Sequence, residues 1–146
     1  FKWRCLVVEI SKSINDKIMR ICEKGFPYEV CGVLIGTKNN NKYIIKDFYD
    51  CENLNKARAA DRYELNPKDY MQGEKIAKDL GLSIIGIYHS HPSHPAIASE
   101  TDKLYAWPEM AYMIYSIYEN KFKNLITWEI DEIKDEFIEI ETKIYE

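Results

Sequence analysis

The 146-residue sequence predicts a single mixed α/β domain that covers residues 1–146. Two stretches, 11–24 and 68–80, place apolar residues at helical spacing, whereas several others are short and apolar or alternate like strands. No repeat, linker or low-complexity segment divides the sequence, and its length is that of one ordinary domain. Hydrophobic residues make up 46% of the chain and charged residues 30%, which is typical of a globular protein.

The first elements expected along the chain are a strand, a helix and a hairpin. Residues 3–10 (WRCLVVEI) are apolar and rich in β-formers, which favours a strand. The helix over 11–24 presents isoleucines on one face and stops at Gly25. The apolar runs 31–36 and 42–50 flank an asparagine-rich turn, and this pattern predicts a β-hairpin.

A second helix follows a short strand expected at 62–65. Asn66 before Pro67 reads as a helix N-cap followed by proline at the first helical position. The helix then runs over 68–80 and ends at Gly81. Its expected inner face consists of Tyr70, Met71, Ile76, Ala77 and Leu80.

The nearly all-apolar run 82–91 (LSIIGIYHSH) predicts a central strand that is covered on both faces. A loop over 92–98 and a short helix from Glu100 toward Trp107 follow it. The remaining apolar and alternating runs predict three further strands, at 110–118, 124–130 and 136–145.

Charge and cysteine usage exclude several classes of protein. The formal net charge is −4 and no basic stripe occurs, so neither nucleic acid nor an anionic membrane surface is an expected partner. No apolar run is long enough to span a bilayer, and no signal peptide is apparent. The four cysteines lie far apart without a CxxC pair, which argues against a disulfide framework. We therefore expect a reduced, cytoplasmic protein.

All three histidines of the chain lie in HSHPSH, at residues 89–94. On a strand, side chains at i and i+2 face the same way, so His89 and His91 project together from the strand end, where Pro92 terminates the ladder. Such a pair can bind a metal ion. Solvated HxH pairs are also common, and the pattern alone leaves both interpretations open.

Ser99 and Asp102 allow two interpretations as well. The run S-E-T-D at the start of a helix is a near variant of the capping box, in which serine and an acidic residue three positions later bond each other's backbone. Asp102 also suits the positive end of the helix dipole. Capping is the simpler account of each residue taken alone, and it does not exclude a ligand role.

The combined spacing resembles the signature of the JAMM (MPN+) zinc metalloproteases. It reads H-S-H-P, six residues, then S-x-x-D, with E-V-C-G-V-L-I-G some sixty residues upstream. The segments YEVCGVLIG and Arg58 to Pro67 are similar to the compact prokaryotic branch, and the resemblance covers most of the chain. It implies a single MPN domain: a curved, mixed, mostly antiparallel sheet, two main flanking helices, a short helix after the metal loop and a cytidine-deaminase-like layout.

The resemblance also implies roles for five side chains. His89, His91 and Asp102 would bind one Zn²⁺ per chain and leave the fourth position for water, as in a catalytic zinc site. Glu29 would act as general base while this water attacks the scissile carbonyl, and later as proton donor. Ser99 would donate a hydrogen bond to the oxyanion.

The implied reaction is hydrolysis of the bond after the C-terminal diglycine of a small ubiquitin-like protein, by a peptidase or isopeptidase. The chain leaves little room for large insertions near Asp102, so it resembles the short enzymes that act on β-grasp sulfur carriers. A diglycine tail can bind as an added strand in a narrow groove. The identity of the carrier, the choice between linear and isopeptide bonds, and a homodimer all stay open.

Four further residues are weaker candidates. Arg58 and Arg62 are candidate contacts for the substrate tail or the new carboxylate, although surface arginines need no such role. His94 is expected at the rim of the site, either near substrate or merely exposed. Cys31 would face the same way as Glu29 if a strand already began there, but a small buried residue is the simpler account.

Three other functions are alternatives to this one. A zinc nucleoside deaminase requires a paired-cysteine ligand set, which is absent. An HxH amidohydrolase requires a (β/α)₈ barrel, for which 146 residues are too few. A catalytically inactive MPN-type scaffold that binds proteins stays open, although such relatives lack ligand residues and this chain has the whole set. The 11 tyrosines suit either a binding surface or half-buried strands.

Overall fold

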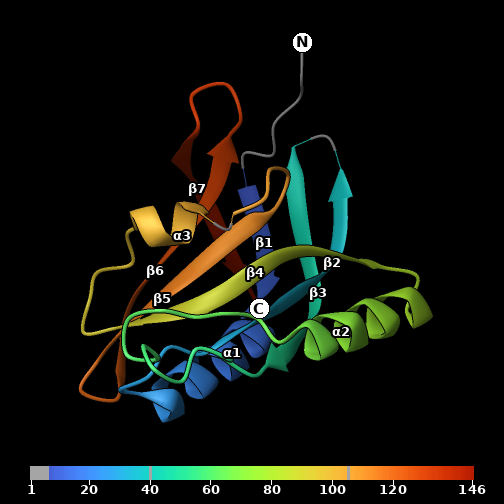
Figure 1. Cartoon of the computed structure of the whole chain (residues 1–146). Coiled ribbons are helices and arrows are strands. Elements are labelled where there is room, and N and C mark those ends of the chain that lie inside the picture. The colour runs from blue at the N-terminus through green and yellow to red at the C-terminus, as the bar shows by residue number, and fades with distance from the viewer. Residues whose placement is uncertain (1–6, 40, 105) are drawn as a thin grey trace.

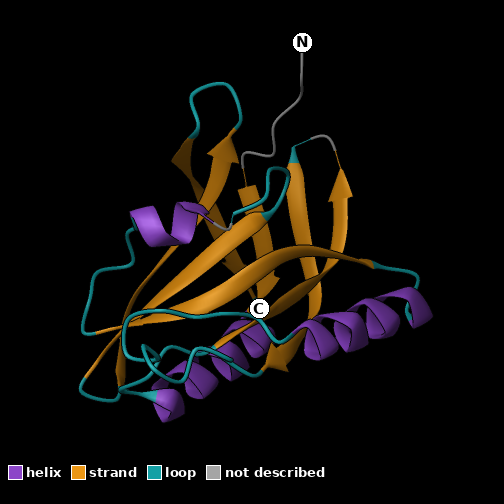
Figure 2. Cartoon of the chain, in the orientation of Figure 1, coloured by secondary structure: helices purple, strands orange, loops and turns teal. Residues whose placement is uncertain are grey.

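The computed structural model describes residues 7–39, 41–104 and 106–146 (Figure 1). Strands form the body of the molecule, and two long helices pack against it (Figure 2). In chain order the elements are β1 (Val7–Ser11), α1 (Lys12–Gly25), β2 (Cys31–Asn39), β3 (Lys42–Cys51), α2 (Pro67–Asp79), β4 (Ser83–Pro92), α3 (Glu100–Leu104), β5 (Ala111–Tyr118), β6 (Lys121–Asp131) and β7 (Glu136–Tyr145).

The sheet is mixed, as expected, but it closes into a barrel in the order β1-β3-β2-β4-β5-β6-β7. Four of its pairings are antiparallel and three are parallel. The expectation of a merely curved sheet is wrong because β1 pairs along both edges: Val8 faces Tyr43 of β3 and Thr142 of β7. Closure leaves neither β3 nor β7 as a free edge.

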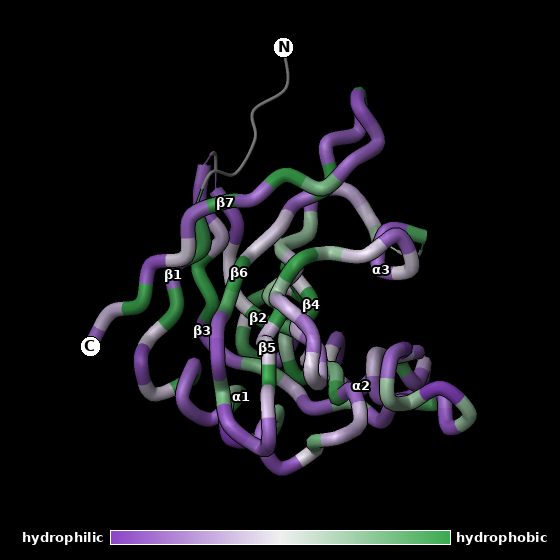
Figure 3. The backbone as a smooth tube through the Cα atoms, turned by 90° about the vertical axis from the view of Figure 1, so that its left-hand side faces the viewer, coloured by the Kyte–Doolittle hydropathy of each residue, from purple (hydrophilic) through white to green (hydrophobic). Residues whose placement is uncertain are grey.

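Two hydrophobic clusters fill the domain, one on each side of β4. The first contains Ile18 and Cys22 of α1 together with Tyr88 of β4. The second contains Ala77 of α2 together with Ile87 of β4. The prediction that the 82–91 strand is covered on both faces is therefore confirmed. Figure 3 shows the hydrophobic stretches within the strands, including β1 and β4.

Close packing fixes two glycines. A Cβ atom on Gly36 would lie 1.8 Å from the Ile44 carbonyl oxygen, at the bulge where β2 shifts its register against β3. On α2, a Cβ atom on Gly73 would lie 2.7 Å from Cγ2 of Val33. Gly73 thus lets α2 approach β2 and determines which face of the helix is buried.

That close approach corrects the expected inner face of α2. Gly73 and Ala77 are the buried residues of the helix, whereas Met71 and Leu80 are 66% and 55% exposed. Tyr70 and Ile76 pack against the second cluster, as expected.

Several expected boundaries also shift. The helix after the metal-candidate loop ends at Leu104 and does not reach Trp107. The expected strand at 62–65 is reduced to one bridge between Asn53 and Leu65. Of the strand expected over 3–10, residues 3–6 lie outside the described part. The predicted N-cap is confirmed, since Oδ1 of Asn66 accepts from the Lys68 N–H at 2.9 Å.

Cys22, Cys31 and Cys51 are free and buried, while Cys5 lies outside the described residues. In the part of the chain that the structure describes, no helix has the length and apolar character needed to cross a membrane.

Candidate metal centre

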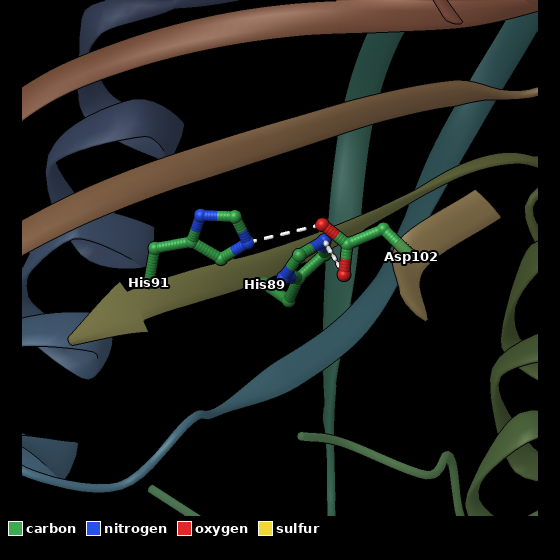
Figure 4. Close-up of side chains that lie close together, drawn as sticks. All are labelled: His89, His91 and Asp102. Atoms are coloured by element: carbon green, nitrogen blue, oxygen red, sulfur yellow. Dashed lines mark hydrogen bonds and ion pairs between the residues drawn. The ribbon is translucent and has the colours of Figure 1, made fainter. Parts of the chain in front are cut away.

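The C-terminal end of β4 carries His89 and His91 (Figure 4). By strand alternation both share a face with Ile87, which packs in the cluster that contains Ala77 of α2. His89 is fully buried and His91 is 6% exposed. Strand β4 lies between β2 and β5, so His89 pairs with Cys31 on one side and with Ile114 on the other. The rigid centre of the sheet therefore fixes both imidazoles.

The third member of the cluster comes from α3. Oδ1 of Asp102 lies 3.7 Å from Nε2 of His89, and Oδ2 lies 3.1 Å from Nε2 of His91. One ligand atom from each residue can be chosen so that all lie within 4.8 Å of one another. Two nitrogens and one carboxylate oxygen are one of the protein ligand sets that catalytic zinc sites use.

The capping box predicted for Ser99 and Asp102 is present. The Asp102 N–H donates to Oγ of Ser99 at 3.0 Å, and the Ser99 N–H donates to Oδ2 of Asp102 at 2.9 Å. Capping and metal binding are therefore compatible, because the cap aims the Asp102 carboxylate at the histidines.

The loop after β4 orients His91 through the carbonyl group of Pro95, and the carbonyl groups on either side of it tie the loop to β5 and β6. Nδ1 of His91 lies 2.8 Å from the Pro95 carbonyl oxygen. On either side, Oγ of Ser116 donates to the His94 carbonyl at 2.5 Å and Nε1 of Trp128 donates to the Ala96 carbonyl at 3.0 Å. A proton on Nδ1 leaves the lone pair of Nε2 free for a metal ion, which is a common support for metal-binding histidines.

Unpartnered buried atoms provide a test of whether a metal ion fits. Among the described residues, three buried side-chain atoms lack a hydrogen-bond partner: Oε1 of Glu29 and both ring nitrogens of His89. The closest approach, from Oε1 of Glu29 to Nδ1 of His89, is 3.6 Å. Buried polar atoms are usually satisfied, and a missing ion is one recognised reason when they are not. The donor set therefore fits a metal ion.

Electrostatics agrees with a cation-binding carboxylate. Burial by itself raises the pKa of Asp102, but His89 and His91 outweigh it and bring the pKa well below its ordinary value. Burial lowers the pKa of His89, but the Asp102 and Glu29 carboxylates raise it by more than burial lowers it, so the net shift is upward. Asp102 is thus ionised at neutral pH and available as a ligand.

Glu29 lies in the loop between α1 and β2 and is 6% exposed. The Glu29 N–H donates to the Ala59 carbonyl at 2.6 Å, and Nδ2 of Asn53 donates to the Glu29 carbonyl at 3.1 Å. The next residue, Val30, bonds Ser90 in both directions. Ser90 separates the two candidate histidine ligands, so the backbone of β4 fixes the position of Glu29 as well.

Cys31 begins β2 rather than extending a strand back to Glu29, so the condition for a shared face is not met. The thiol is buried and directed toward the Cys51 carbonyl, 3.9 Å away. Burial raises its pKa. The group within metal-binding distance does not include it.

A cavity of about 580 Å³ opens beside the cluster and is shared with it at Asp102. The ring of Tyr63 lines this cavity and stacks on His89 with centroids 4.4 Å apart. Arg62 also lines it and donates to Oγ1 of Thr101 at 3.2 Å. Arg58 instead pairs with Asp61 in solvent, and neither it nor the exposed His94 is among the lining residues.

The structure thus brings His89, His91, Asp102 and Glu29 together, with Ser99 next to them on the cap of α3. Sequence reasoning did not identify Tyr63, although the segment from Arg58 to Pro67 was singled out. It also missed Ser116 and Trp128, because nothing in a single sequence links two distant strand residues to a loop carbonyl.

Comparison with known proteins identifies relatives of the chain. The family described as prokaryotic homologs of the JAB domain matches residues 11–131. Desampylase of Haloferax volcanii is 29% identical over 114 residues, which are 75% of this chain and 80% of that protein. Desampylase of Pyrococcus furiosus is 30% identical over 82 residues, 55% of this chain and 54% of that protein.

Among solved structures, a protein from Desulfitobacterium hafniense superimposes with a TM-score of 0.82. The match covers 96% of this chain and 93% of that one, at 24% identity. A likeness at this identity concerns the fold.

Proposed function

The chain belongs to the prokaryotic homologs of the JAB domain, within the JAMM/MPN family, and we propose that it is a zinc-dependent peptidase or isopeptidase. Its substrate in this proposal is a small ubiquitin-like protein, cut after the C-terminal diglycine. The observation that carries the proposal is the buried His89–His91–Asp102 group with the unpartnered carboxylate oxygen of Glu29 beside it.

Two histidine nitrogens and one aspartate oxygen would hold one zinc ion and leave room for water and substrate. A zinc ion bound there supplies Lewis-acid polarisation of a carbonyl group and lowers the pKa of water to near 7. The protein orients its ligands through the Pro95 carbonyl and the cap of α3.

Glu29 is the proposed general base and, later in the reaction, the proton donor. Its Oε1 is buried and has no hydrogen-bond partner among the described residues, so it is free to accept a proton from the attacking water. The same atom then donates that proton to the departing amine nitrogen, which restores the carboxylate. A fixed backbone holds this carboxylate in place for both transfers.

Ser99 is the proposed oxyanion donor. Its Oγ accepts from the Asp102 N–H, so its hydroxyl proton is not used by the cap. A side-chain donor directed at the developing oxyanion contributes roughly 3 kcal/mol to catalysis in other hydrolases.

The substrate class rests on the relatives. Two of them carry the name Desampylase, which denotes removal of a ubiquitin-like modifier. We extend that activity to this chain and propose a β-grasp sulfur carrier as the modifier. Arg62, at the edge of the cavity, is a proposed contact for the tail.

The test is cleavage of a ubiquitin-like protein fused through its diglycine to a reporter, by the zinc-loaded protein and by Glu29→Gln. We expect Glu29→Gln to retain zinc and to lose at least about 100-fold in kcat, because general acid–base catalysis contributes that much. Glu139→Gln, on the exposed face of β7, is the matched control and should cleave normally. Full activity of Glu29→Gln would refute the mechanism, and no cleavage by the wild type would favour a binding scaffold.

A further inference from the structure

The connecting segment between β3 and α2, residues 52–66, contacts two of the groups at the metal centre. Its Ala59 carbonyl accepts from the Glu29 N–H at 2.6 Å, which holds the backbone of the proposed base. Its Tyr63 ring stacks on the candidate ligand His89 with centroids 4.4 Å apart. All of residues 52–66 are described, and they form neither a helix nor a strand. The spacing between the two contacts therefore depends on hydrogen bonds within the segment.

The half-buried side-chain amide of Asn53 makes four of these hydrogen bonds. Nδ2 of Asn53 donates to the Glu29 carbonyl at 3.1 Å and to the Arg62 carbonyl at 3.0 Å. Oδ1 of Asn53 accepts from the Asn55 and Glu64 N–H groups, each at 3.0 Å. A side-chain amide has two donor hydrogens and an oxygen that accepts two bonds, so all four positions are used. These four partners leave the amide a single orientation.

The donor and acceptor sides of the amide hold different parts of the site. The donor side holds the Glu29 carbonyl, and with it the residue that carries the proposed base. The acceptor side holds the N–H of Glu64, which directly follows Tyr63, the residue stacked on His89. Asn53 therefore relates the position of the base to the position of a candidate metal ligand.

The Glu29 carboxylate depends on its backbone for its position. Oε1 of Glu29 is buried without a hydrogen-bond partner among the described residues, and it lies 3.6 Å from Nδ1 of His89. A base transfers a proton over a hydrogen-bond distance of about 3 Å, and a misplacement of about 1 Å can lower a rate by about 100-fold. Hydrogen bonds to Ser90 fix the next residue, Val30. Those to the Ala59 carbonyl and Asn53 fix Glu29 itself.

We propose that Asn53 is a positioning residue for the proton transfers of Glu29. Its donor side determines where the Glu29 backbone lies, and its acceptor side keeps that backbone in register with Tyr63 and His89. The proposal rests on the proposed function and deepens it, because it assigns part of the catalytic rate to a residue that acts only through Glu29.

Asn53→Asp tests the donor side alone. The substitution keeps the shape and the accepting oxygen but replaces the NH₂ group by an oxygen that faces the Glu29 and Arg62 carbonyl groups. We expect kcat on a diglycine fusion to fall at least about tenfold, with KM within about twofold of the wild type. Zinc affinity in chelator competition should stay within about twofold, because the acceptor side still holds Glu64 next to Tyr63.

The same substitution in the Glu29→Gln background distinguishes positioning of the base from a merely structural role. If Asn53 acts through Glu29, Asn53→Asp should lower kcat by less than about twofold when the base is already absent. A structural role would lower kcat by the same factor in both backgrounds, and that result would overturn the proposal.

Asn66→Ala is the matched control, because Asn66 lies in the same segment and caps α2 through the Lys68 N–H at 2.9 Å. It should lower the free energy of unfolding and keep kcat within about twofold of the wild type. A loss of kcat as large as that of Asn53→Asp would show that any damage to the segment suffices, and would overturn the proposal.

Hydrogen exchange of the Glu29 N–H in the metal-free protein tests the same contact without any substrate. It should be about fivefold faster in Asn53→Asp than in the wild type, since one lost hydrogen bond eases local opening by about that factor. Unchanged exchange, or full kcat of Asn53→Asp beside an active wild type, would overturn the positioning role and leave the proposed function intact. An inactive zinc-loaded wild type would instead refute the proposed function, even if exchange confirmed the contact.

Discussion

Ser99→Ala separates the two roles that the structure gives to one hydroxyl group. The hydroxyl oxygen accepts from the Asp102 N–H at 3.0 Å, and the hydroxyl proton stays available for an oxyanion. The Ser99 backbone N–H, which orients the Asp102 carboxylate at 2.9 Å, is unaffected by the substitution. The variant should therefore keep its metal site while it loses a cap and a catalytic donor.

The two losses differ in size. Removing a serine N-cap costs about 1 kcal/mol of folding stability, and an exposed cap on a short helix should cost less than most. Removing an oxyanion donor typically lowers kcat by about 100- to 1000-fold, which is about 3 to 4 kcal/mol. We expect a drop of that size in kcat with little change in KM, because the donor acts in the transition state.

Three measurements on one protein preparation separate the capping role of Ser99 from its catalytic role: kcat and KM on a diglycine fusion, the free energy of unfolding by denaturant, and zinc affinity by chelator competition. Ser99→Thr keeps both functions of the hydroxyl and should restore both kcat and stability. If Ser99→Ala lost stability but less than about fivefold in kcat, Ser99 would be a helix cap only and the oxyanion assignment would be refuted.

Three other substitutions or treatments test separate parts of the structure. Trp128→Phe removes the N–H that donates to the Ala96 carbonyl and should weaken zinc binding by about three- to tenfold, since one hydrogen bond is worth about 1 kcal/mol. Unchanged zinc affinity in chelator competition would show that the loop does not depend on this hydrogen bond. Gly36→Ala puts a Cβ atom against the Ile44 carbonyl and should lower the free energy of unfolding by at least about 2 kcal/mol, whereas native stability in a denaturant titration would contradict the close contact. Burial raises the pKa of Cys51 to about 12, so its thiol should resist maleimide at pH 8 in the folded protein and react after unfolding. Rapid labelling of Cys51 in the folded protein, detected by mass spectrometry, would contradict the burial.

The sequence alone predicts the parts of the structure that depend on local spacing. The central strand, the N-cap at Asn66 and the capping box of Ser99 follow from residues within a few positions of one another. Closure of the barrel does not, because the register of β1 against β7 joins residues more than 130 positions apart. The exposure of Met71 has a similar origin: helical periodicity fits several rotations of α2, and Gly73 against Val33 selects one of them.

The candidate site likewise has a part that the sequence predicts and a part that it does not. The motif spacing identifies His89, His91 and Asp102 as candidate ligands in the sequence, and in the structure their ligand atoms lie within 4.8 Å of one another. The support from Trp128 and the stacking of Tyr63 arise from contacts across the sheet and from a loop, for which a single sequence has no signal.

We propose that one metal ion at this cluster makes the protein a hydrolase of diglycine-linked modifiers. The most direct test is to remove metal from the wild type with a chelator, add zinc stepwise and record the rate of cleavage of a diglycine fusion at each step. We predict no cleavage without metal and a rise that levels off at one zinc per chain. Cleavage that persists without metal, or a protein that stays inactive with one zinc bound per chain, would contradict this role of the metal ion.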